Sequence, residues 1–216
     1  MEKPGIIIVD DHRLFRSGLK YILDESGKYK VVAEATNGIE LMTLLEYHSP
    51  QLVILDINMP VMDGIMAARQ IAQKYPHQKL LMLSMYGEPD SYSLLLDLGI
   101  KGFILKDADN EEFFLAIDKI LAGGTYFSQD LLLKILRKSD VSETVKISRR
   151  EKEILICIGE GLSNLEIATL LRISQRTVER HRSNLMEKTG SKNAVRLIIF
   201  ALKNNWITLE ALEVRR

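Results

Sequence analysis

The stretch IIIVDDHRLF, residues 6–15, carries the pattern that decides the fold of the first half of the chain. Four apolar residues precede two adjacent aspartates and an amphipathic stretch, which predicts a buried strand leading into a helix. Similar apolar runs recur at 31–35, 52–55, 80–84 and 102–105. Amphipathic stretches lie at 13–24, 39–47, 65–74, 90–97 and 110–121. Five strands alternating with five helices predict an α/β fold with a doubly wound five-stranded parallel sheet.

The second half of the chain reads differently. Residues 124–146 predict a linker with a helical spacer at 130–138, followed by a polar run. The helices expected beyond it lie near 149–160, 163–171, 175–188 and 192–203. We therefore expect an α/β domain at 1–123 and a small all-α domain at 147–216.

Charge divides the chain in the same way. The net charge of the 216 residues is zero, but residues 1–125 hold 12 Lys and Arg against 18 Asp and Glu, whereas residues 126–216 hold 17 against 11. A basic second domain favours a polyanionic partner. The single cysteine, Cys157, suits a reducing cytoplasm, and no apolar run is long enough to span a membrane. We expect a cytoplasmic protein that makes no use of a membrane.

Polar residues follow the predicted strands. Asp10 and Asp11 close the first strand, Asp56 the third, Ser84 the fourth and Lys106 the fifth. The carboxyl ends of parallel strands form the ligand-binding edge of an open sheet. Three carboxylates suit Mg²⁺, and a carboxylate can accept a phosphoryl group whose charge a metal and a lysine neutralise. Taken singly, Asp10 or Asp11 is better explained as a cap of the helix at 13–24, Asp56 as an ordinary strand-end residue and Lys106 as a solvated side chain, but all of them together favour the phosphate and metal site.

The motifs VDDHRLFRSGL, LVILDINMPVMDGI, LLMLSMY and KGFILKD resemble, in order and spacing, the flavodoxin-like receiver domain of two-component response regulators, over about residues 5–121. The resemblance implies Asp56 as phospho-acceptor, with Mg²⁺ held by Asp10, Asp11, Asp56 and the backbone carbonyl of Asn58. It also implies switch and phosphate-pairing roles for Ser84, Phe103 and Lys106, and a shaping role for Pro60 and Gly64 in the acceptor loop. The chain departs from the usual pattern in Lys106-Asp107, in Phe103 where tyrosine is commoner, and in the large Met85 beside Ser84. Phe103 has an equally simple reading as a core aromatic.

The basic half reads as a short helix, a turn and a polar basic helix at 175–188, which is helix-turn-helix geometry. Val178 and Leu185 mark its buried stripe, and His181 near that stripe is expected to be packed. DNA contacts are expected from Arg176, Thr177, Glu179, Arg180, Arg182, Ser183 and Lys188, the alternative being a solvated face. The motifs REKEIL, EGLSNLEIA, ISQRTVERH and LMEKTG, within 147–205, resemble the LuxR-type helix-turn-helix. Joined to a receiver, this module implies the NarL/FixJ class.

The last predicted helix is apolar around most of its circumference, so it must be covered on more than one side. The family implies a homodimer on DNA in which this helix meets its twin through Val195, Ile198, Ile199 and Leu202. The alternative is that the C-terminal tail, WITLEALEV, folds over the helix.

Together these patterns predict a phosphorylation-controlled transcription regulator rather than an enzyme. Its expected partners are a sensor histidine kinase, double-stranded promoter DNA and RNA polymerase, with Mg²⁺ as cofactor. One alternative is a DNA-binding protein with a vestigial receiver. Another is an aspartyl-phosphate phosphatase, which generally needs a second acid two residues after its nucleophile, where this chain has Asn58.

Overall fold

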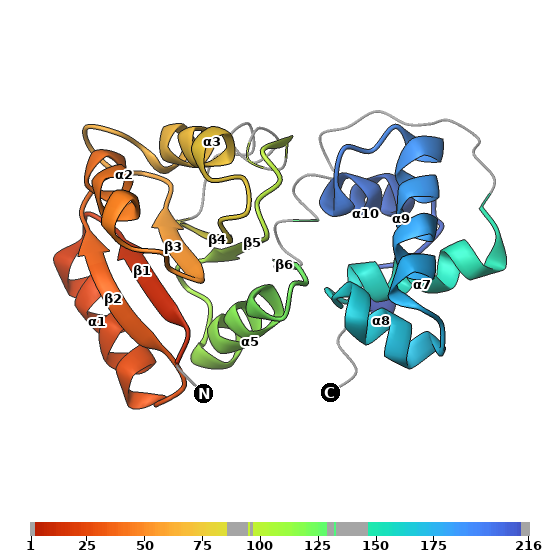
Figure 1. Ribbon diagram of the computed structural model, residues 1–216, viewed down its shortest axis with the longest axis horizontal. Helices are drawn as coiled ribbons and strands as arrows, with labels where there is room; N and C mark the ends of the chain where they lie inside the picture. The colour runs from red at the N-terminus through yellow and green to blue at the C-terminus, as the bar shows by residue number, and fades with distance from the viewer. Residues whose placement is uncertain (1–2, 86–94, 96, 129–131, 133–146, 213–216) are drawn as a thin grey trace. The chain divides into compact units, whose positions relative to one another are not determined.

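The computed structural model describes residues 3–85, 95, 97–128, 132 and 147–212. The chain divides into two compact units, Met1–Leu121 and Ala122–Arg216 (Figure 1). The helix predicted at 90–97 and the spacer predicted at 130–138 lie almost entirely outside the described residues.

The N-terminal unit is built on a sheet whose strands follow the order β2-β1-β3-β4-β5, and β6, from residues beyond Leu121, is the sixth strand of this sheet, next to β5. The strands are β1 (Gly5–Val9), β2 (Lys30–Ala35), β3 (Leu52–Asp56), β4 (Leu80–Ser84), β5 (Gly102–Leu105) and β6 (Tyr126–Phe127). Strands β1 to β5 pair in parallel, in a register that places Val9 opposite Leu55 and Asp56 opposite Leu83. The predicted fold class is confirmed, but the predicted number of strands is wrong, because β6 has only two residues and therefore leaves no recognisable apolar alternation.

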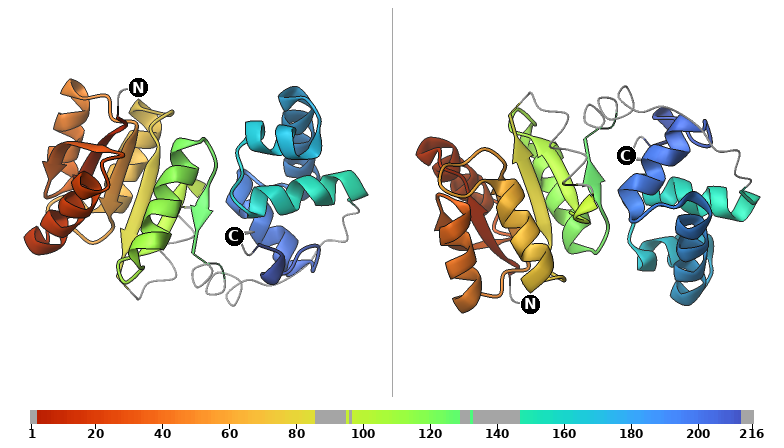
Figure 2. Two further views of the ribbon diagram at one scale, coloured as in Figure 1. Left: turned by 90° about the horizontal axis from the view of Figure 1, so that it is seen from below. Right: turned by 90° about the horizontal axis from the view of Figure 1, so that it is seen from above.

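Helices cover both faces of this sheet. They are α1 (Arg13–Glu25), α2 (Gly38–Tyr47), α3 (Gly64–Lys74) and α5 (Asn110–Leu121). Helices α1 and α5 lie on one face and α2 and α3 on the other, as the two views of Figure 2 show. Every residue of β1, β3, β4 and β5 is buried, which is why these strands read as continuous apolar runs.

The C-terminal unit contains the four predicted helices. They are α7 (Arg149–Gly159), α8 (Asn164–Leu171), α9 (Gln175–Thr189) and α10 (Ala194–Lys203), followed by a short 3₁₀ turn, Glu210–Leu212. A polar side chain caps the start of each of the four, from Ser148, Ser163, Ser174 and Asn193. Such caps accept hydrogen bonds from the amide groups that a helix leaves free at its start. The residues at these positions therefore determine where the helices begin. No helix among the described residues is long and apolar enough to cross a membrane.

Candidate functional site

The strand-end residues of the N-terminal unit meet in a buried charged cluster. The ammonium nitrogen of Lys106 lies 2.8 Å from Asp10 Oδ2 and 2.8 Å from Asp56 Oδ2. The side chains of these three residues are 4%, 0% and 2% exposed, respectively, so water screens their charges little. Strands β1 and β3 are neighbours, and the parallel sheet brings the residue after β5 to the same edge. One lysine therefore neutralises part of the charge of two buried carboxylates.

Burial and pairing act against each other in this cluster. Burial raises the pKa of Asp56, and the hydrogen bond and charge of Lys106 offset only part of that rise. For Lys106, burial alone would lower the pKa, but the hydrogen bonds and charges of Asp10 and Asp56 outweigh it and the pKa is raised. The lysine is thus held as a cation beside a carboxylate whose negative charge is incompletely compensated.

The cluster has oxygen atoms available for a metal ion. Apart from ion pairs with Lys106 and His12, the buried atoms Asp10 Oδ2, Asp11 Oδ1 and Asp56 Oδ2 have no hydrogen-bond donor among the described residues. One ligand atom from each of Asp10, Asp11, His12 and Asp56 falls within 4.8 Å of the others. Carboxylate oxygens converging in this way fit a hard divalent cation such as Mg²⁺.

Sequence reasoning missed His12, although it follows the two aspartates directly. Its backbone amide donates to Asp10 Oδ1 at 2.8 Å, and its Nδ1 lies 3.0 Å from Asp11 Oδ1. His12 therefore fixes how the two carboxylates are turned. The signal in the sequence was its position at the start of α1, where a residue faces the carboxyl end of the sheet.

The backbone of Asp10 is held from outside the cluster. Arg16 donates from Nη1 to the Asp10 carbonyl oxygen at 2.6 Å, and its Nε lies 3.2 Å from Glu34 Oε2. Lys20 pairs with the other oxygen of Glu34 at 2.8 Å. The hydrogen bond and charge of Lys20 lower the pKa of Glu34, and Arg16 adds to this. This network, which connects α1 with β2, orients the peptide that carries Asp10.

The turn after Asp56 depends on a glycine. The Gly64 amide donates to the Ile57 carbonyl at 2.8 Å, and a Cβ at Gly64 would lie only 2.1 Å from the Asp56 carbonyl oxygen. Val61 in the same loop has a left-handed backbone, with φ at 68°. The loop therefore folds tightly beneath Asp56 and leaves no space for a side chain at position 64.

Ser84 and Phe103 occupy neighbouring strands beside the cluster. Ser84 is buried, and its hydroxyl donates to the backbone oxygen of Met85 at 2.7 Å. The Lys106 amide donates to the Ser84 carbonyl at 2.8 Å, which fixes the end of β5 to the end of β4. Phe103 is 1% exposed, so in this structure it is a core aromatic, while Met85 is exposed.

The second candidate site is the exposed face of α9. Val178 and Leu185 are fully buried, which confirms the stripe predicted for this helix. Arg176, Glu179, Arg180, Ser183 and Lys188 are exposed, and Thr177, His181 and Arg182 are half-buried. Burial lowers the pKa of Arg182. The polar face of α9 thus presents several cationic side chains along one helix, as a helix that enters a DNA groove does.

Lys188 has an additional role inside the C-terminal unit. Its ammonium nitrogen lies 2.6 Å and 2.9 Å from the two carboxylate oxygens of Glu151, a side chain that is 4% exposed. Burial raises the pKa of Glu151, but the Lys188 and Ser148 hydrogen bonds overcome this and the pKa is lowered. The Lys188–Glu151 pair connects α9 with the start of α7. If Lys188 contacts DNA, its ammonium must do so while it remains paired with Glu151.

The four side chains predicted to pair α10 with its twin are buried. Val195, Ile198, Ile199 and Leu202 are 2%, 3%, 3% and 8% exposed. After α10 the chain turns back: the Trp206 amide donates to the Ala201 carbonyl at 2.9 Å, and the rings of Trp206 and Phe200 meet edge to face at 5.3 Å. This is the alternative in which the tail packs against the helix. The role of the four side chains in a dimer stays a prediction, and it would require them to leave their present packing.

Comparisons with known proteins identify the family of each part of the chain. Residues 6–118 match the response regulator receiver domain, and residues 145–201 match the bacterial regulatory proteins of the luxR family. The transcriptional regulatory protein DegU of Brevibacillus brevis is 32% identical over 225 residues, covering 95% of each chain. The oxygen regulatory protein NreC of Staphylococcus aureus (strain bovine RF122 / ET3-1) is 35% identical over 209 residues, covering 92% of this chain and 96% of NreC.

A solved structure of two RcsB dimers bound to two parallel DNAs is also similar. It has a TM-score of 0.59 and 25% sequence identity, and the match covers 94% of this chain and 99% of RcsB.

Proposed function

Because this chain belongs to the response regulators that join a receiver domain to a LuxR-type DNA-binding domain, we propose that phosphorylation of Asp56 controls its binding to promoter DNA. The observation that carries this proposal is the buried cluster in which Lys106 lies 2.8 Å from both Asp10 and Asp56. A buried carboxylate beside a fixed cation is suited to accept a phosphoryl group, because the cation neutralises charge on the transferred oxygens.

The transfer itself exchanges one bond for another. An oxygen of the Asp56 carboxylate attacks the phosphorus of a phosphohistidine on a sensor histidine kinase, the O–P bond forms, and the P–N bond breaks with the electron pair returning to the imidazole. Lys106 faces the oxygens of the transferred group. Mg²⁺, when bound by Asp10, Asp11, Asp56 and the Asn58 carbonyl, supplies further positive charge at this position.

Ser84 and Phe103 would transmit the change. The Ser84 hydroxyl donates to the Met85 carbonyl in this structure, and a phosphoryl oxygen on Asp56 offers it a stronger, charged acceptor. When Ser84 turns toward the phosphoryl group, the Met85 carbonyl loses its donor. Phe103 on β5 would then repack into the space behind Ser84.

The output is DNA binding by the C-terminal unit. Helix α9 would lie in the major groove, with contacts from Arg176, Thr177, Glu179, Arg180, Arg182, Ser183 and, beside its ion pair, Lys188. Dimers on DNA, as in the RcsB structure, would place two such helices on a two-fold related site. In such a dimer, α10 would pair with its twin through Val195, Ile198, Ile199 and Leu202. These side chains are buried in the structure, so they would first have to become exposed. RNA polymerase is the expected partner at the promoter.

A small phosphodonor tests the proposal. Incubation with acetyl phosphate and Mg²⁺ should add one phosphoryl group to the wild-type chain, detected by mass spectrometry, and none to Asp56→Ala. Asp24→Ala, which removes an exposed carboxylate from α1, is the matched control and should be phosphorylated like the wild type. Phosphorylation should then raise the affinity for promoter DNA in the wild type and in Asp24→Ala, and leave Asp56→Ala unchanged.

The alternatives predict other results. A vestigial receiver would give the same DNA affinity for all three chains whatever the donor. An aspartyl-phosphate phosphatase would release phosphate repeatedly from the donor, whereas we expect at most slow turnover because the position two residues after Asp56 is Asn58, which is no general acid.

A further inference from the structure

His12 precedes α1 at the position whose side chain usually caps a helix. Its side chain makes no such hydrogen bond, whereas Asn37 and Asp63 cap α2 and α3 in the same unit. The His12 imidazole turns instead toward the two carboxylates that follow β1. The side chain at this position therefore serves the acidic cluster rather than the helix.

The distances between His12 and these carboxylates are those of neighbouring ligands around one metal ion. The imidazole Nδ1 lies 3.0 Å from Asp11 Oδ1 and 3.3 Å from Asp10 Oδ1. Two ligands that each lie about 2.1 Å from an octahedral ion, at right angles to each other, are about 3.0 Å apart. The imidazole nitrogen is therefore close enough to bind the ion that the carboxylates bind.

The imidazole nitrogen and the Asp11 oxygen lie close together without a hydrogen bond. Asp11 Oδ1 is a buried atom and accepts no hydrogen bond within the part of the chain that the structure describes, although Nδ1 is only 3.0 Å away. A hydrogen bond needs the N–H group to point at the oxygen, whereas two ligands of one ion direct their lone pairs at the ion. The arrangement of the two atoms is that of two ligands.

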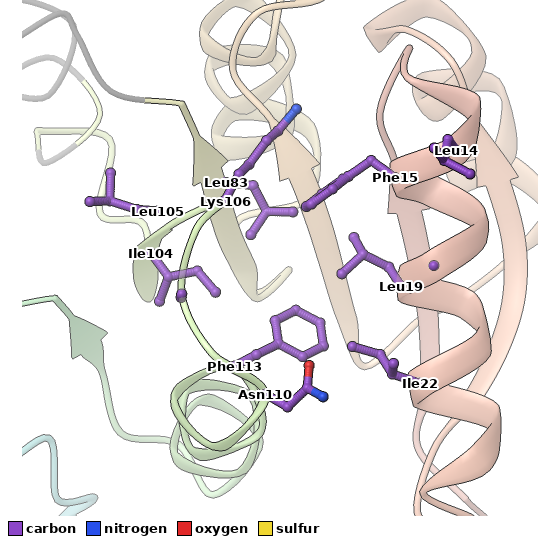
Figure 3. A pocket seen from close by; sticks show the side chains of 12 residues that line it. Leu14, Phe15, Leu19, Ile22, Leu83, Ile104, Leu105, Lys106, Asn110 and Phe113 are labelled. Atoms are coloured by element: carbon purple, nitrogen blue, oxygen red, sulfur yellow. The ribbon is translucent and has the colours of Figure 1, made fainter.

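The opposite side of the cluster is occupied by Lys106, which Figure 3 shows beside the ring of Phe15. The Lys106 ammonium contacts Oδ2 of Asp10 and lies 5.0 Å from the centre of the Phe15 ring. The side chain of Lys106 is 4% exposed, whereas those of Asp11 and His12 are 30% and 57% exposed. An ion from solvent therefore reaches the carboxylates from the side of Asp11 and His12, where the imidazole can bind it.

We propose that His12 is a ligand of the metal ion and that the site therefore binds a first-row transition ion more tightly than Mg²⁺. Mg²⁺ prefers oxygen ligands, whereas an imidazole nitrogen suits ions such as Fe²⁺, Ni²⁺ and Zn²⁺. One nitrogen added to the carboxylates of Asp10, Asp11 and Asp56 changes which ion the site selects. This inference deepens the proposed function and rests on its metal site, because it names a further ligand and the class of ion.

Calorimetry of the full chain, prepared without a polyhistidine tag, with Ni²⁺ and separately with Mg²⁺ tests the proposal. His12→Gln removes the imidazole, and it should fold like the wild type because the side chain is 57% exposed and caps no helix. We expect His12→Gln to weaken Ni²⁺ binding by about tenfold or more and Mg²⁺ binding by no more than about twofold. His77→Gln, at an exposed histidine of the same unit, is the matched control and should bind both ions like the wild type.

Proton NMR of the Ni²⁺ complex identifies the ligand. Ring protons of an imidazole bound to this paramagnetic ion should appear at strongly shifted positions in the wild type and in His77→Gln, and they should be absent from His12→Gln. Excess Mg²⁺ should remove the shifted signals, because both ions compete for the same carboxylates.

Three results would overturn the proposal. One is an equal loss of Ni²⁺ and Mg²⁺ affinity in His12→Gln, which would mean that His12 only orients the carboxylates. The others are a wild-type chain that binds no Ni²⁺ and a complex whose shifted signals do not depend on His12.

Mass spectrometry after treatment with acetyl phosphate and Mg²⁺ reports the proposed function separately. If the wild type is phosphorylated while His12 binds no metal, the proposed function stands and this inference fails. If His12 binds Ni²⁺ while no phosphoryl group is added, the inference stands and the proposed function fails.

Discussion

Gly64→Ala should destabilise the receiver unit selectively. An added Cβ would lie 2.1 Å from the Asp56 carbonyl oxygen and 2.9 Å from the Ile57 Cα, both of which are backbone atoms. Reaching a contact of 3.4 Å, the lower limit of ordinary packing, requires the two backbone segments to separate by 3.4 − 2.1 Å, about 1.3 Å. That movement breaks the 2.8 Å hydrogen bond from the Gly64 amide to the Ile57 carbonyl. The lost hydrogen bond costs about 1 kcal/mol, and the strain of overpacking adds about 1–3 kcal/mol.

The chain offers a matched control and a way to separate its two units. Gly18 lies within α1, where an added Cβ meets no atom within 4 Å, so Gly18→Ala should stabilise the receiver by about 0.5–1 kcal/mol. The single tryptophan, Trp206, lies in the C-terminal unit, so its fluorescence reports the unfolding of that unit alone.

In urea, Gly64→Ala should lower the midpoint of the receiver transition seen by far-UV circular dichroism by the equivalent of about 2–4 kcal/mol. The tryptophan transition should stay where it is. If the receiver transition of Gly64→Ala has the same urea midpoint as that of the wild type, the close approach beneath Asp56 is not a constraint and the reasoning fails. An equal shift in the tryptophan transition would refute the assignment of the effect to the receiver.

Three further residues give predictions with separate measurements. Lys188→Met removes the partner of buried Glu151 and should lower the stability of the C-terminal unit, measured by the urea transition of tryptophan fluorescence, by about 1–3 kcal/mol. Arg149→Met is the control: its side chain is 96% exposed, and the change in stability should be no more than about 0.5 kcal/mol. The pKa of Glu151 is lowered in the folded state, so its contribution to the stability of the C-terminal unit is present above the ordinary pKa of 4.5 and is lost as the pH falls below it. The urea midpoint of the tryptophan transition should therefore fall between about pH 5 and 3, and it should fall less in Lys188→Met. Arg16→Gln, which frees the Asp10 carbonyl, should weaken Mg²⁺ binding by about tenfold in isothermal titration calorimetry while Arg16→Lys recovers part of it, and equal affinities would exclude a positioning role. Arg180→Ala should weaken binding to promoter DNA and reduce the slope of log affinity against log salt by about one, whereas an unchanged slope would show that Arg180 contacts no phosphate.

The sequence specifies the receiver fold well because its strands are buried on both faces. In β1 and β3 every residue is buried, so each strand appears as an unbroken apolar run that ends at the functional aspartates. The right-handedness of parallel connections limits the possible strand orders, and the structure supplies the order itself. Residues of β6 are half-buried and only two in number, so its pairing with the sheet edge depends on tertiary contacts that no local pattern encodes.

The sequence predicts some members of the acidic cluster but misses His12, and it does not predict the distances between them. The sequence places Asp10, Asp56 and Lys106 at one edge, because strand ends converge. It cannot tell that Lys106 reaches both carboxylates, since that depends on the rotamers and packing of a side chain that crosses the edge. The hydrogen bond from Arg16 to the Asp10 carbonyl could not be predicted for the same reason. Helix spacing alone does not determine which backbone atom a long side chain contacts.

Helix α10 shows where a correct pattern leaves two outcomes open. Its apolar circumference requires cover on more than one side, and both a second α10 and the chain's own tail satisfy that requirement. In the structure the tail returns to the helix, with Trp206 against Phe200, and Val195, Ile198, Ile199 and Leu202 are covered. The apolar pattern of a helix predicts how much of its surface must be buried, but it does not identify the element that covers it.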